Sequence, residues 1–136
     1  MTSVISLAGC VITNNKNEIL LIHRSTPNRT QWELPGGKIE PKESPEQTAL
    51  RELEEELGIQ VEIVRKLGEK TFNEDGYTMN YHWFKANIVK GTPSLTESKF
   101  DQIKYWSWQE MEEMKIYLSS NTKNLLNQYN QGNIRP

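Results

Sequence analysis

Glutamates are concentrated in one short segment of the chain. Residues 40–56 carry seven of the 18 acidic residues and only two bases, so the segment has a net charge of −5, whereas the whole chain of 136 residues has −2. Converging carboxylates supply the oxygen ligands that Mg²⁺ prefers. The single cysteine, Cys10, excludes a cysteine-based metal site and reads as a small buried thiol. The segment therefore predicts a site for hard divalent cations, with a solvated charged helix face as the alternative.

The same segment carries the signals of a helix over Ser44–Leu57. Ser44 is a natural N-cap, Pro45 fits the first helical position, and Gln47 completes a capping box. Gly58 is a C-terminal stop signal. These local signals fix where the glutamates lie on the helix.

On a helical wheel the carboxylates Glu52, Glu55 and Glu56 fall within one sector about 100° wide. That sector lies beside an apolar stripe, which predicts that the helix packs on a core and presents its carboxylates along the edge of that contact. The stripe consists of Ala49, Leu50, Leu53 and Leu57.

From Gly37 to Ile59 the sequence has the spacing G-x5-E-x7-R-E-L-x-E-E-x-G-I. This segment, residues 37–59, resembles the Nudix box at every specified position, and the number of fixed positions makes a chance match very improbable. The resemblance implies an α+β fold, a Nudix-type α/β/α sandwich with a central mixed sheet, in a single domain over residues 1–136. It also implies hydrolysis of a nucleoside diphosphate linked to another group.

The resemblance implies Mg²⁺, with Mn²⁺ as a possible replacement, and assigns roles within and beyond the box. Glu52 is a metal ligand or the general base, and Glu43 pairs with Arg51 to hold the loop against the helix. The implied metal ligands are the carbonyl of Gly36 and the side chains of Glu52, Glu55, Glu56 and Glu97. The implied catalytic residues are Glu52, Glu55, Glu97 and Arg51.

Glu97 is assigned from the loop that follows Gly91-Thr92-Pro93, which resembles a loop that brings a distant acid to the metal. The alternative for Glu97 is an exposed loop acid, and Asp101 is then the nearby substitute. Which of Glu52 and Glu97 activates the water stays open.

Within the family the resemblance is closest to the MutT-like branch. It implies hydrolysis of nucleoside triphosphates, including oxidised purine dNTPs such as 8-oxo-dGTP, to nucleoside monophosphate and pyrophosphate. Arg24 would approach the nucleotide, with a solvated arginine as the alternative, and Asn121 would read the base or act as a helix N-cap. The implied substrate-binding residues are Arg24, Gly37, Lys38, Tyr77 and Asn121.

The chain departs from this branch between the box and the next strand. The phenylalanine and arginine that line the base pocket of the branch have no clear counterpart, and Phe72 and Tyr77 are loose candidates for stacking on the base. Tyr77 also keeps open a hydrolase of dinucleoside polyphosphates. From another class, a non-catalytic nucleotide-binding sensor is the alternative, although the box keeps every glutamate.

The remaining elements are assigned from periodicity and turn signals. Residues 4–22 read as a β-hairpin and residues 25–31 as a loop. Further strands are predicted at 60–70, 79–89 and 102–108, and further helices at 109–114 and 122–131. The four tryptophans are assigned to the core or to sheet packing: Trp32, Trp83, Trp106 and Trp108.

Charge and composition exclude several classes of protein. The net charge of −2 and the lack of a basic stripe argue against a nucleic-acid partner. No apolar run approaches 18 residues and no signal peptide is recognisable, which predicts a cytoplasmic protein without a membrane partner. The expected partner is a small-molecule nucleotide, and the chain is expected to be a monomer or a homodimer.

Overall fold

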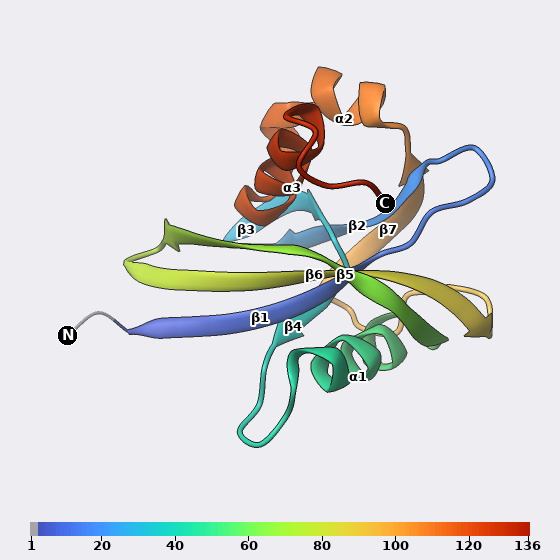
Figure 1. Ribbon diagram of the computed structural model, residues 1–136, viewed down its shortest axis with the longest axis horizontal. Helices are drawn as coiled ribbons and strands as arrows, with labels where there is room; N and C mark the ends of the chain where they lie inside the picture. Colours follow the sequence, from blue (N-terminus) through green and yellow to red (C-terminus); the bar gives the residue numbers. More distant parts are fainter. Residues whose placement is uncertain (1–2) are drawn as a thin grey trace.

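The computed structural model describes residues 3–136, which fold into two β-sheets held between helices (Figure 1). The strands are β1 (Val4–Val11), β2 (Ile19–Thr26), β3 (Arg29–Glu33), β4 (Gly36–Lys38), β5 (Gln60–Glu74), β6 (Tyr77–Lys90) and β7 (Phe100–Trp106). The helices are α1 (Pro45–Leu57), α2 (Trp108–Glu113), the short 3₁₀ helix η1 (Lys115–Tyr117) and α3 (Ser120–Asn130).

The two sheets give the molecule a mixed α+β architecture. One sheet has the order β4-β1-β6-β5 and the other has the order β3-β2-β7. Strand β1 runs parallel to β6, and every other pairing is antiparallel. Helix α1 lies on one side of the sheets and α2 with α3 on the other (Figure 1), so the predicted α/β/α sandwich with a mixed sheet is confirmed.

Helix α1 has the predicted start and end. Ser44 caps it, both hydrogen bonds of the capping box with Gln47 are present, and Gly58 ends it with a left-handed φ of 66°. The apolar stripe differs at one position, because Leu50 is 40% exposed. Thr48 and Glu56 are buried on this helix, so one of the carboxylates lies inside the protein.

The core consists of two clusters, one on each side of the sheets. One cluster packs Leu53 and Leu57 of α1 against Phe84 of β6. The other packs Trp83 of β6 against Leu125 of α3. Successive residues of β6 therefore point to opposite layers, as strand geometry requires.

The predicted hairpin over residues 4–22 is wrong. Strand β1 has β4 and β6 as its neighbours, whereas β2 belongs to the other sheet. The segment that connects β1 to β2 is paired near its turn, where Leu20 N donates to Ile12 O at 3.0 Å, Asn14 N donates to Glu18 O at 3.1 Å and Thr13 bridges Ile19. The apolar run that begins at Ile19 is buried throughout, because both faces of β2 are covered. The strand therefore lacks the alternation of apolar and polar residues that a hairpin with one solvent-exposed face would show.

The predicted loop over residues 25–31 is also wrong. Strand β2 continues to Thr26 and turns at Pro27–Asn28 into β3, which pairs back along it. Strands β5 and β6 extend beyond the predicted ranges, to a tight turn at Asp75–Gly76.

Two further boundaries follow from capping and packing. Strand β7 ends at Trp106, and Trp108 begins α2 after the N-cap Ser107 and stacks on the ring of Tyr129 with the centroids 3.7 Å apart. Trp108 therefore packs between helices, not in a strand. Across residues 3–136, no helix combines the length and apolar composition needed to cross a membrane.

Candidate active site

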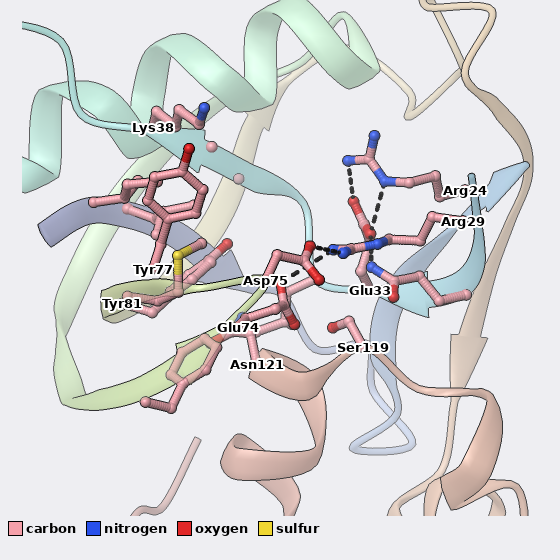
Figure 2. A pocket seen from close by; sticks show the side chains of 18 of the residues that line it. Arg24, Arg29, Glu33, Lys38, Glu74, Asp75, Tyr77, Tyr81, Ser119 and Asn121 are labelled. Atoms are coloured by element: carbon pink, nitrogen blue, oxygen red, sulfur yellow. Dashed lines mark hydrogen bonds and ion pairs between the residues drawn. The ribbon is translucent and has the colours of Figure 1, made fainter. Parts of the chain in front are cut away.

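A cleft of about 680 Å³ opens between the two sheets, beside the N-terminal end of the box (Figure 2). This volume is within the ordinary range for small-molecule sites. Eight of the residues singled out from the sequence line it: Arg24, Gly36, Gly37, Lys38, Glu52, Phe72, Tyr77 and Asn121. The cleft therefore brings together residues from both sheets, α1 and the start of α3.

The helix glutamates differ in exposure. Glu56 is 1% exposed, and its Oε1 accepts a hydrogen bond from the Gly36 backbone N–H at 2.8 Å. The Glu52 carboxylate lies against Gly37, where an added Cβ would come 2.5 Å from it. Glu55 is exposed. Gly37 thus lets the backbone of β4 pass directly over the Glu52 carboxylate, and the neighbouring Gly36 N–H contacts the Glu56 carboxylate.

Negative charge is in excess around Glu56. Burial raises the pKa of the Glu56 carboxyl well above its ordinary value, and the nearby Glu52 raises it further. Glu33 and Glu97 act in the same direction, and the Gly36 hydrogen bond opposes them only in part. Burial also raises the pKa of Glu52, although Arg51 opposes this. A bound divalent cation would offset the repulsion within such a buried set of carboxylates.

Across residues 3–136, no three acidic, histidine or cysteine side chains form a ready-made metal cage. Mg²⁺ keeps several waters in proteins and is bound through one or two carboxylates plus substrate phosphates. Glu52 and the Gly36 carbonyl at the cleft, together with the buried Glu56 that contacts Gly36, are the groups with the oxygen chemistry for this role.

Arg51 organises the loop that leads into the helix. Its guanidinium donates to both oxygens of Glu43, at 2.7 and 3.0 Å, and to the backbone carbonyl of Lys38 at 3.1 Å. It also donates to Glu52 at 3.0 Å and to Glu55 at 3.1 Å. The planar guanidinium of Arg51 therefore links the box loop to the helix and orients the Glu52 carboxylate.

The ion pair between Glu43 and Arg51 is expected to make the stability of the fold depend on pH. The Arg51 guanidinium, with help from the Thr48 hydroxyl, lowers the pKa of Glu43 to about 2. A carboxyl with a lowered pKa stabilises the fold above its ordinary pKa of about 4.3, and the contribution is lost as the pH falls toward 2. Between pH 5 and pH 2.5 we expect the melting temperature of the parent to fall more steeply than that of Glu43→Gln. If calorimetry gave the same dependence of melting temperature on pH for both proteins, this role of Glu43 would be contradicted.

The loop after β6 brings Glu97 to the box. Ser94 N donates to Leu57 O at 3.0 Å and Thr96 N to Glu56 O at 3.2 Å, so the loop caps the last carbonyls of α1. Glu97 follows directly and adds its charge to the field at Glu56, although it does not line the cleft. The predicted substitute Asp101 does not line the cleft either, and its Oδ1 lies 2.6 Å from His23 Nδ1.

Arg24 points into the cleft from β2 and is paired there. Its Nε and Nη2 donate to the two oxygens of Glu33 on β3, at 3.1 and 2.7 Å (Figure 2). The guanidinium also lies 4.9 Å from the ring centroid of Phe100. Arg24 is therefore a fixed wall of the cleft and not a solvated strand end.

Asn121 lines the cleft, and it is not the N-cap of α3. The N-cap is Ser119, whose hydroxyl accepts from Thr122 N. The Asn121 Oδ1 accepts the indole N–H of Trp83 at 2.8 Å, which fixes its amide at 8% exposure. Its NH₂ group keeps donor capacity for a ligand.

The cleft also has an apolar wall. Ile5 and Leu7 of β1 and Phe72 and Met79 of the β5–β6 hairpin line it, and Tyr77 stands at the rim with 48% exposure. The opposite wall is polar and comes from β2 and β3. Cleft residues that sequence reasoning did not single out include Arg29, Glu33, Glu74, Asp75, Met79, Tyr81 and Lys99. No local motif marks them, because they meet only through the packing of the sheets.

The chain is similar to known proteins in both sequence and fold. The family model described as NUDIX domain matches residues 6–129. The MutT protein from Methanosarcina mazei has a TM-score of 0.85 at 25% identity, with 98% of each chain covered. A MutT NUDIX hydrolase from Burkholderia pseudomallei has a TM-score of 0.82 at 27% identity, over 93% of this chain and 98% of that one. An 8-oxo-dGTP diphosphatase from Proteus vulgaris is 44% identical over 57 residues, 40% of this chain and 51% of that protein.

Proposed function

Because this chain belongs to the Nudix hydrolase family, whose pyrophosphohydrolase chemistry it shares, we propose that its substrates are nucleoside triphosphates. The proposed reaction is Mg²⁺-dependent hydrolysis to nucleoside monophosphate and pyrophosphate, with oxidised purine dNTPs such as 8-oxo-dGTP among the substrates. The observation that carries the proposal is the position of the buried Glu56–Gly36 contact at one end of a nucleotide-sized cleft. The 8-oxo-dGTP diphosphatase of Proteus vulgaris supports the choice of substrate class.

The two ends of the cleft suit the two ends of such a substrate. Glu56 and the Gly36 carbonyl would hold the metal ion, joined by Glu52 where Glu97 serves as the base; when bound, the ion neutralises the polyphosphate and polarises its oxygens. Lys38 and Lys99 line the same cleft and would bind phosphate oxygens. The apolar wall and the Asn121 amide would receive the base.

Glu52 is the proposed general base of the reaction. Its carboxylate faces the cleft, and Arg51 holds one oxygen at 3.0 Å, which leaves the other to take a proton from the attacking water. Burial raises the pKa of Glu52, which strengthens it as a base compared with an exposed glutamate. Glu97 is the alternative base, brought to the box by the loop that caps α1.

A substrate panel with product analysis tests the proposal. The panel contains canonical and oxidised dNTPs, ADP-ribose and dinucleoside polyphosphates, each with and without Mg²⁺. We expect nucleoside monophosphate and pyrophosphate from the triphosphates, and a several-fold higher KM in Arg24→Ala because the wall formed with Glu33 is lost. Release of ATP from a dinucleoside polyphosphate as the preferred reaction would replace the proposed substrate. Binding without turnover of any compound would indicate a nucleotide sensor.

A further inference from the structure

Charged side chains join the two hairpins that border the cleft. Arg29, the first residue of β3, donates through Nη1 to Glu74 Oε1 at 3.1 Å and through Nη2 to Asp75. Figure 2 shows Arg29 reaching across toward these two acids, which lie at the end of the β5–β6 hairpin. All three residues line the cleft. We call this set, Arg29 with Glu74 and Asp75, the clasp.

The backbone on both sides of the clasp has a defined shape. Asp75 and Gly76 have φ values of 53° and 82°, the left-handed pair that a two-residue hairpin turn requires. On the other hairpin, the Thr26 hydroxyl donates to the Arg29 carbonyl at 3.1 Å. The two hairpin ends are therefore preformed, and side chains alone make the connection between them.

The clasp lies at the apolar end of the cleft. Phe72 and Met79 are cross-strand partners on the β5–β6 hairpin, and Glu74 is only two residues beyond Phe72 toward the turn. The carboxylates and backbone proposed to hold the metal come from β4 and α1 instead. A nucleotide with its phosphates at the box would thus place its base beside Phe72 and under the clasp.

We propose that the clasp determines specificity by closing the cleft over the base, so that unsubstituted bases fit and bases with a bulky apolar substituent are rejected. This inference rests on the proposed function, which puts a nucleotide in the cleft. Arg29 and Glu74 have side-chain exposures of 34% and 21%, so their ion pair is partly shielded from water. An apolar group forced against it would desolvate both charges without replacing their hydrogen bonds, which is costly.

Equilibrium binding of products tests the clasp without any need for turnover. Calorimetric titration would compare AMP with N6-benzyl-AMP and GMP with N2-benzyl-GMP, and the readout is the ratio of the two Kd values in each pair. The test variant is Glu74→Gln combined with Asp75→Asn, which keeps the side-chain shapes, and asparagine tolerates the left-handed conformation of position 75. We expect the ratio to fall by about tenfold, equivalent to roughly 1.4 kcal/mol.

A matched control and a second variant make the result decisive. Glu69 pairs with Lys66 at 2.8 Å on the same hairpin and does not line the cleft, so Glu69→Gln should leave the ratio unchanged. Arg29→Gln breaks the clasp from the opposite side and should lower the ratio like the double variant. An unchanged ratio in folded clasp variants overturns the clasp alone. If the parent binds neither AMP nor GMP, the proposed function fails and the clasp falls with it.

Discussion

A Glu56→Gln variant is expected to lose metal-dependent turnover by about a thousandfold or more while remaining folded. A metal ion contributes several kcal/mol of transition-state stabilisation in reactions of this type, and each 1.4 kcal/mol is about tenfold in rate. The substitution removes the most deeply buried carboxylate of the box without changing its shape. The Gly36 N–H can still donate to the amide oxygen of the new side chain, so the backbone of β4 keeps its contact.

The same variant separates metal binding from folding. Burial and the neighbouring carboxylates raise the pKa of Glu56, which means that its charge destabilises the metal-free fold at neutral pH. We therefore expect the metal-free Glu56→Gln protein to melt at or above the temperature of the parent. Adding Mg²⁺ should raise the melting temperature of the parent, because a ligand stabilises the state that binds it. That increase should be absent in the variant.

Glu54 provides the matched control for this experiment. It lies on the same helix, it is exposed, and Glu54→Gln makes the same chemical change two residues away. Its turnover and its response to Mg²⁺ should equal those of the parent. Full Mg²⁺-dependent activity in Glu56→Gln would show that the metal is held without this carboxylate.

Replacing Gly9 by alanine is expected to lower the melting temperature by about 4–12 °C, the effect of overpacking a core by roughly 1–3 kcal/mol. Gly9 lies in β1 between Gly36 of β4 and Trp83 of β6. A Cβ at this position would overlap the Tyr81 hydroxyl and come 2.6 Å from the Pro35 carbonyl. That carbonyl accepts from Cys10 N at 3.1 Å, so the backbone has little room to move away.

A double-mutant cycle with Tyr81→Phe identifies the cause of this loss. Removing the hydroxyl relieves one of the two overlaps, so Gly9→Ala should cost less stability in the Tyr81→Phe background than in the parent. Gly68 is the control, because a Cβ there meets atoms only at 3.7 Å, and Gly68→Ala should be nearly neutral. A parental melting temperature for Gly9→Ala in thermal unfolding would show that Tyr81 and Pro35 can give way.

The clearest agreement between sequence and structure is helix α1, and the reason is that its signals are local. The cap at Ser44, the box with Gln47 and the stop at Gly58 each act within one or two turns, so neighbouring residues are sufficient to define them. The spacing of the glutamates along the helix follows from the same periodicity. The difference in exposure between these glutamates does not follow from periodicity, because the burial of Glu56 and the exposure of Glu55 depend on the strand β4 that passes over the helix.

The strand pairings could not be predicted from signals between neighbouring residues. The apolar runs in residues 4–22 predicted two adjacent strands, yet β1 and β2 are in different sheets. Strand pairing is decided by which distant segment completes the core, and β1 pairs with β6, about 74 residues further along the chain. The polar residues 25–31 likewise form the end of one hairpin because β2 continues and β3 pairs with it.

The sequence alone therefore determined the family and the helix that carries the carboxylates, and it predicted metal binding as the role of those carboxylates. Tertiary structure decided which carboxylate is buried, that Arg24 is held by Glu33, and that Arg29 reaches Glu74 across the cleft. The physical reason is the separation along the chain between the residues that interact. Helix signals and motif spacing are interactions between residues a few positions apart, whereas the walls of the cleft come from segments that only the packing of two sheets brings together.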